Sequence, residues 1–196
     1  MKNNLIKSIE IEVGYFKIKA NDIVIVDVLP DSETLGNRFD FFEDVCDFNK
    51  PITSMVTELE LRGIKLNDII KKLIQSGFFN KNFNDSLEQI SHHVAIIKGR
   101  TTHCRSPKVL IRDGLPDDFY LVPAEITFHL AYLISHFITK EFLNIHNMDR
   151  VFIMSDPLEK GDKIVEWDPS YNNSITTALY DNPYSGDRNA GYLFFY

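Results

Sequence analysis

The stretch 123–142, PAEITFHLAYLISHFITKEF, constrains the fold more than any other part of the chain. It contains the longest run without a charged residue, 126–139. Wound as an α-helix, it would carry apolar side chains around most of its circumference, so it has to be buried on nearly every side. The run is too short to cross a bilayer, which takes about 20 apolar residues. We therefore expect one long apolar helix near 123–142, covered by other elements.

Two segments near the amino terminus have the patterns of β-strands. Residues 9–15, IEIEVGY, alternate apolar and polar side chains, which is typical of a strand with one solvated face. Residues 22–29, DIVIVDVL, form a nearly continuous β-branched run, which favours a strand buried on both faces. The short connection between them predicts an antiparallel hairpin. Further strands are expected at 108–112, 150–154, 163–167 and 191–196.

Helices are expected between these strands. The segment 51–63 begins with Pro51 and ends with a glycine, and 67–76 begins with Asn67 as a candidate N-cap. The segment 84–99 has a capping-box pattern at its start, and 38–48 carries Phe and Val at helical spacing. Although 53–79 also resembles the spacing of a helix-turn-helix, its second helix has no arginine, which favours packing into the core over reading DNA.

These elements predict one α+β domain over residues 1–196. We expect a mostly antiparallel sheet, made of the N-terminal hairpin and the C-terminal strands, packed against a helical layer that includes the long helix.

Charge is unevenly distributed along the chain, whose net charge is −7. Residues 51–112 have ten basic and five acidic side chains, whereas residues 113–196 have five basic and thirteen acidic ones. An acidic total argues against nucleic acid as the main partner, because phosphate binding depends on Lys and Arg. The two cysteines, Cys46 and Cys104, form no CxxC motif, and the amino-terminal sequence lacks the apolar run of a signal peptide. We expect a cytoplasmic protein that does not enter a membrane.

Segment 98–112, KGRTTHCRSPKVLIR, carries five basic residues and no acidic one, and it includes the pair His103–Cys104. Three interpretations stay open: a surface for an anion or an acidic partner, a reactive thiol at Cys104 stabilised by neighbouring cations, and a basic loop without a binding role. For the first of these, the candidate binding residues are Arg100, His103, Arg105, Lys108 and Arg112.

A narrow polar stripe lies on the expected long helix. Its members follow one another at spacings of three and four residues: Glu125, His129, Tyr132, His136 and Thr139. Glu125 and His129 could hold one metal ion between them, but His136 lies about 10 Å further along the axis and would need ligands from another element. No HExxH motif is present, so we predict neither a metal nor a cofactor. The other interpretations are the solvated edge of the helix and a row of hydrogen bonds to a second helix.

Taken together, these patterns favour a small protein-interaction or regulatory module that uses charge-segregated surfaces. Segment 98–112 would bind a protein partner with an acidic surface, or an anionic ligand. The alternative is a hydrolase or transferase for an anionic substrate, with Cys104 or the residues Glu125, His129 and His136 in its catalytic site.

Overall fold

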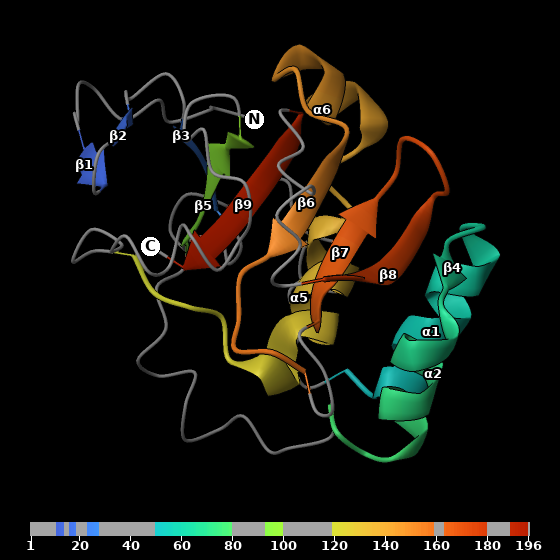
Figure 1. Cartoon of the computed structure of the whole chain (residues 1–196). Coiled ribbons are helices and arrows are strands. Elements are labelled where there is room, and N and C mark those ends of the chain that lie inside the picture. Colours follow the sequence, from blue (N-terminus) through green and yellow to red (C-terminus); the bar gives the residue numbers. More distant parts are fainter. Residues whose placement is uncertain are drawn as a thin grey trace, which may run out of the picture.

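The computed structural model describes residues 11–13, 16–18, 23–27, 50–79, 93–99, 119–158, 163–179 and 189–195. Its helical elements are α1 (Ile52–Leu61), α2 (Asp68–Gln75), the 3-10 turn η3 (Ala124–Ile126), α5 (Thr127–Ile134) and α6 (Lys140–Ile145). Its strands are β1 (Ile11–Val13), β2 (Phe16–Ile18), β3 (Ile23–Asp27), β4 (Lys65–Leu66), β5 (His93–Lys98), β6 (Arg150–Ile153), β7 (Lys163–Asp168), β8 (Ser174–Leu179) and β9 (Ala190–Phe195) (Figure 1).

Seven of these strands form one mixed sheet in the order β3-β5-β9-β6-β7-β8-β4. The pairs β6–β9 and β4–β8 are parallel, and the other four pairs are antiparallel. The α+β class is confirmed, but the sheet is mixed, and its two parallel pairs were not predicted. Both parallel pairs join strands that are distant in sequence, so no local turn signal could indicate their direction.

The prediction of an N-terminal hairpin between 9–15 and 22–29 was wrong. Strand β1 pairs with β2 in a separate two-stranded sheet, whereas β3 pairs with β5. Strands β3 and β5 pair because both are buried: Ile23 and Val24 of β3 are buried, and so are residues 94–97 of β5. A strand buried on both faces is best matched by another such strand rather than by an alternating one that carries glutamates. Residues 93–98, expected to end a helix, are therefore a strand.

The long apolar helix near 123–142 is not present as one helix. The chain forms η3 and α5, turns at residues 135–139, and starts again as α6. At the break, Ser135 Oγ donates to the carbonyl of Tyr132 (2.6 Å), and Thr139 Oγ1 caps α6 by accepting from the amide of Phe142 (3.2 Å). The indole of Trp167 on β7 donates to the carbonyl of Ile138 (2.8 Å), so a carbonyl inside the break has a buried partner.

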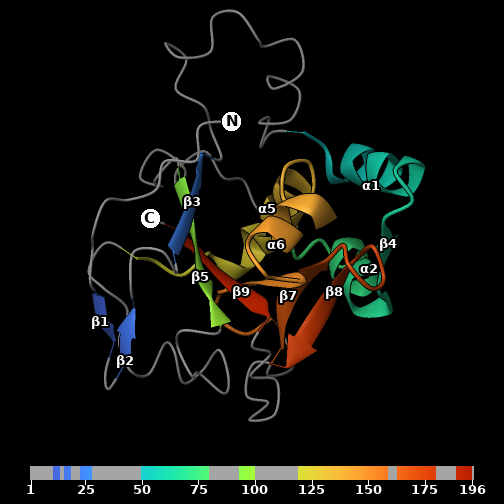
Figure 2. The same cartoon turned by 90° about the horizontal axis from the view of Figure 1, so that it is seen from above.

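The two faces of the sheet have separate apolar cores. Alternate side chains, among them Leu193 and Phe195 of β9, pack with the helices. The intervening ones, among them Tyr192 and Phe194, pack on the opposite face. Figure 2 shows α5 and α6 on one side of the strands, with α1 and α2 near β4. The helical layer is thus confirmed, although it consists of several short helices.

Several local predictions are confirmed. Helices α1 and α2 match the expected segments 51–63 and 67–76, and the side chain of Asn67 caps α2 by accepting from the amide of Ile70 (2.9 Å). Strands β6, β7 and β9 match the three expected C-terminal strands. Strand β8 was not predicted, because its sequence SITTAL lacks a clear apolar alternation.

Replacement of a buried leucine tests the assignment of α5 to the core. Leu133 is 2% exposed, so Leu133→Ala should lower the free energy of unfolding by about 2–5 kcal/mol, through lost apolar contact and a remaining cavity. A matched control is Leu61→Ala at the end of α1, where the side chain is 82% exposed and the cost should stay within about 0.5 kcal/mol. Urea denaturation measures both. A loss below about 1 kcal/mol at Leu133 would contradict its place in the core.

Gly191 lets β9 lie close to its neighbours. A Cβ atom at this position would stand 2.5 Å from Cγ2 of Ile96 on β5 and 2.8 Å from the sulfur of Met148. The Ile96 methyl group cannot move away easily because it branches at Cβ of a buried strand residue. A side chain at position 191 therefore has no room.

We expect Gly191→Ala to lower the free energy of unfolding by about 1–3 kcal/mol, the usual cost of overpacking a core. Combination with Ile96→Ala removes the clashing methyl group, so the double variant should lose less stability than the two single variants together. Chemical denaturation of the four proteins measures this coupling. Strict additivity would contradict the steric explanation.

Candidate functional site

The basic segment 98–112 lies almost entirely outside the residues that the structure describes, which include only Lys98 and Gly99 of it. This holds for Cys104 and for all the candidate binding residues: Arg100, His103, Arg105, Lys108 and Arg112. The expected strand at 108–112 and the expected helix at 38–48 also lie outside the described residues.

The described residues on either side of 100–118 are placed on the sheet. Lys98 is opposite Gly191 at one end of β9, and Tyr120 forms a bridge with Phe195 at the other end. Phe119 is buried, and its ring stands edge-on to that of Phe194 (6.3 Å between centroids). Residues 98 and 120 are therefore attached to opposite ends of the same interior strand, β9.

The candidate residues of the polar stripe have different environments. Glu125 is half-buried in η3, and His129 is buried at 3% exposure on α5. His136 lies in the turn after α5 and faces α1, where it contacts Arg62. Tyr132 faces α1 as well, through a hydrogen bond to Glu58. The stripe thus divides into a buried part and a part that contacts α1.

The first half of the α1–α5 contact is a cluster of Lys50, Glu58 and Tyr132. The hydroxyl group of Tyr132 donates to Glu58 Oε2 and accepts from Lys50 Nζ (3.0 Å), and Lys50 also forms an ion pair with Glu58. Burial would raise the pKa of Glu58, but hydrogen bonds from Lys50 and Tyr132 outweigh it and lower that pKa. Burial would lower the pKa of Lys50, but its bonds to Glu58 and Tyr132 raise it. The pair is therefore charged at neutral pH.

The second half of the contact is centred on Arg62, the C-cap residue of α1. Its Nη1 donates to Ser135 Oγ and approaches His136 Nε2, both at 3.0 Å, and its Nη2 donates to the carbonyl of Ser135 (2.6 Å). The ring of His136 stands edge-on to Tyr132 at 5.0 Å. One guanidinium group thereby holds the end of α1 to the turn after α5.

The proton affinities in this cluster favour a structural role over a catalytic one. Burial and the hydrogen bond to Glu58 raise the pKa of Tyr132, so its hydroxyl group stays protonated. Burial and the nearby Arg62 lower the pKa of His136 to about 4, which makes it a weak base at neutral pH. A general base works best when its pKa is close to the working pH. Tyr132 and His136 thus form hydrogen bonds to a second helix, whereas Thr139 of the same stripe caps α6.

Lys50, Glu58 and Arg62 were not among the residues that sequence reasoning selected. The i, i+4 spacing of Glu58 and Arg62 on α1 was the available signal, because it places both side chains on one face. Tyr132 and His136 lie more than 70 positions away in the chain. Their contact with this face depends on tertiary packing and could not be predicted from the spacing.

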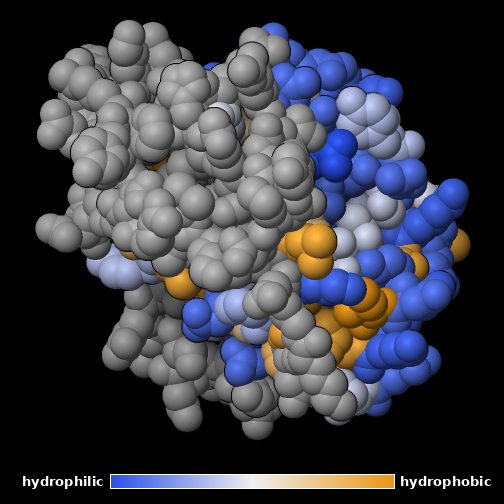
Figure 3. Space-filling model, viewed as in Figure 1, coloured by the Kyte–Doolittle hydropathy of each residue, from blue (hydrophilic) through white to orange (hydrophobic). Residues whose placement is uncertain are grey.

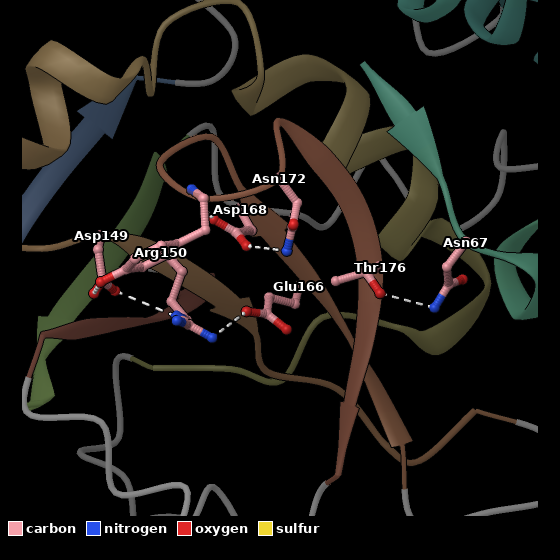
Figure 4. Close-up of polar contacts among 8 residues, drawn as sticks. Asn67, Asp149, Arg150, Glu166, Asp168, Asn172 and Thr176 are labelled. Carbon is pink, nitrogen blue, oxygen red and sulfur yellow. Dashed lines mark hydrogen bonds and ion pairs between the residues drawn. The ribbon is translucent and has the colours of Figure 1, made fainter.

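A second polar cluster joins β6, β7 and the β7–β8 turn (Figure 4). Arg150 contacts Asp149 (3.3 Å) and Glu166 (3.1 Å), and its guanidinium group lies over the ring of Tyr171 (5.2 Å). The hydroxyl group of Tyr171 donates to Asp149 (3.2 Å). Arginine thus offsets the charge of two carboxylates that would be costly to bury alone.

Asp168 closes the turn between β7 and β8. Its carboxylate is buried and accepts from the amide of Tyr171 (3.0 Å) and from Asn172 Nδ2 (3.1 Å). Nearby, Asn67 Nδ2 donates to the hydroxyl groups of Thr176 (2.8 Å) and Thr177 (3.1 Å), which fixes the start of α2 to β8 (Figure 4). These contacts define the hairpin and the position of α2.

Among the described residues, no three His, Cys, Asp or Glu side chains are arranged to hold one metal ion. Within the same residues, no helix has the length and apolar character needed to span a bilayer. Comparisons of the chain with models of known protein families, with curated proteins and with solved structures find no match. Functional inference therefore depends on the residues and contacts described above.

His129 generates a prediction about stability and pH. Its burial lowers its pKa from the ordinary 6.5 to about 4. Below pH 6.5 the unfolded chain therefore takes up a proton that the folded chain does not. The contribution of His129 to stability is complete above pH 6.5 and is lost as the pH falls to about 4, by up to about 3 kcal/mol.

Urea denaturation at several pH values between 7 and 4 measures this loss. In His129→Gln the side chain keeps its hydrogen-bonding capacity without titrating, so stability should decline less steeply with falling pH than in the wild type. Parallel pH profiles of the two proteins would contradict the assignment.

Proposed function

We propose that this protein is a cytoplasmic protein-interaction or regulatory module, in which segment 98–112 binds an acidic partner protein. The observation that carries the proposal is the composition of the segment, with five basic residues and no acidic one in a chain of net charge −7. A small anionic ligand, bound by the same basic residues, is the alternative binding partner of the segment.

The placement of the residues that flank the segment supports this function. Lys98 and Tyr120 are both attached to β9, an interior strand of the seven-stranded sheet. Binding residues are commonly located on connections that a rigid sheet holds in place. A chain segment that lies between two residues attached to a sheet would bind with less loss of conformational entropy than a free tail.

The described cluster between α1 and α5 offers less support for the alternative, a hydrolase or transferase. Tyr132 and His136 are engaged with α1, and the pKa of each is shifted away from the neutral range. Their hydrogen bonds are used to join two helices.

Exposed lysines elsewhere on the molecule provide a control for charge alone. Lys71 and Lys72 are exposed on α2, and each is without an ion pair among the contacts of the described residues. They lie near β4, at the edge of the sheet, whereas Lys98 is on β5 near the opposite edge. The side of the molecule that carries α1, β4 and α2 is largely hydrophilic (Figure 3).

The experiment compares two variants that each remove two positive charges, Arg100→Ala/Arg105→Ala and Lys71→Ala/Lys72→Ala. The probe is a fluorescein-labelled peptide of glutamates, and fluorescence anisotropy gives the dissociation constant. We expect the arginine variant to bind at least about fivefold more weakly than the wild type, because charge-assisted hydrogen bonds to carboxylates are lost. The lysine variant should bind within about twofold of the wild type, since remote exposed charges are screened.

Measurements at several salt concentrations, and with a competing anion, test the electrostatic origin of the binding. Binding should weaken steeply between 0.1 M and 1 M salt, where the screening length falls from about 10 Å to about 3 Å. Thermal melting should be almost unchanged in both variants, because exposed charges contribute little to stability. Equal weakening in the two variants would mean that net charge alone drives binding and would overturn the proposal. Displacement of the peptide by inorganic pyrophosphate at a similar concentration would point to a small anionic ligand instead.

A further inference from the structure

The contact between Arg62 and His136 imposes a condition on the histidine. Arginine is a permanent cation and only donates hydrogen bonds. Its Nη1 lies 3.0 Å from His136 Nε2, so this ring nitrogen has to be the acceptor. The ring of His136 is therefore neutral, with its proton on Nδ1.

The charged groups around His136 come from the two elements that meet there. Helix α1 supplies Arg62 and Glu58, and Lys50 precedes α1. On the side of α5, Tyr132 presents its ring edge-on at 5.0 Å. Arg62 and Lys50 oppose a positive charge on His136, whereas Glu58 favours it. Two cations thus face one anion, and the nearest of the three groups is a cation.

We propose that the Arg62–His136 contact makes the attachment of the carboxyl-terminal end of α1 to α5 sensitive to acid. Protonation of Nε2 turns the acceptor into a donor, which removes the hydrogen bond and places two cations side by side. The bonds from Arg62 to Ser135 are too close to His136 to be unaffected, because Ser135 is its chain neighbour. The guanidinium group then moves away and the last turn of α1 loosens.

The position of Arg62 in the helix explains why the effect is local. Arg62 is the C-cap of α1, and its amide donates to the carbonyl of Glu58 (3.0 Å). The next residue, Gly63, has φ +70°, and nothing lies within 4 Å of the place where a Cβ atom would stand, so no packed side chain holds the end of the helix at this position. Upstream, Met55 and Leu59 keep α1 in the core. Acid therefore releases the end of the helix while its centre stays packed.

The pKa of His136, lowered to about 4, places this change in the acid range. The attachment is complete at neutral pH. It is independent of segment 98–112, so it stands or falls separately from the proposed function.

Nuclear magnetic resonance of the full chain between pH 7.5 and 3.5 tests the proposal. We expect the ring signals of His136 to titrate at least about one pH unit below the ordinary value. The amide signals of Leu61, Arg62 and Gly63 should shift with the same midpoint. In His136→Gln the side-chain oxygen still accepts from Arg62 but does not titrate, so these amide signals should lose that transition.

Two further variants separate this transition from other acid titrations. His146→Gln changes another half-buried histidine, the C-cap residue of α6, and should leave the transition of residues 61–63 intact. In Arg62→Gln the nearest cation is gone, so the midpoint of His136 should rise toward its ordinary value, and this reciprocal result does not require His136→Gln to fold. The proposal is overturned if residues 61–63 titrate apart from His136, or if their transition persists in His136→Gln.

Discussion

The fold depends on the insertion of β9 between β5 and β6. This carboxyl-terminal strand runs antiparallel to β5 and parallel to β6, and so joins strands from the first half of the chain to those of the second half. Its side chains alternate between the two cores, and Gly191 leaves room for Ile96 and Met148. Without β9, the pair β3–β5 would have no link to the rest of the sheet. Segment 98–112 begins beside this strand, so its placement depends on β9 as well.

The elements that could be predicted from the sequence are those with a local signal. Asn67 as a helix cap and the apolar strands β6, β7 and β9 are confirmed. Pairing partners could not be predicted, since β3 joins β5 about 70 positions later in the chain. The ambiguous run VAIIK was assigned to a helix because of a capping pattern before it, but its β-branched side chains are buried in a strand. Short apolar runs fit either structure until their neighbours are known.

The division of the apolar stretch 123–142 has a different physical cause. Its composition correctly predicted burial, and Ile126, Leu130, Leu133, Phe137 and Ile138 are all in the core. The prediction of one continuous helix was wrong. Ser135 and Thr139 form alternative hydrogen bonds with the backbone, and the indole of Trp167 donates a hydrogen bond to the carbonyl of Ile138. The same break brings His136 to the end of α1. The polar stripe could thus be identified from the sequence. The contact of His136 with Arg62 could not, because it depends on where α5 ends.

Several charged side chains in the described part of the chain hold elements together. Arg150 is shared between Asp149 and Glu166, Asp168 binds its own turn, and Lys50 and Arg62 fix α1. Carboxylates already engaged in this way contribute little to neutralising cations at a distance, because each pair is close to neutral from outside. The overall charge of −7 is therefore a poor guide to the potential near any one segment. Because paired carboxylates are already neutralised locally, a chain with an acidic net charge can still have a basic surface that binds an acidic partner.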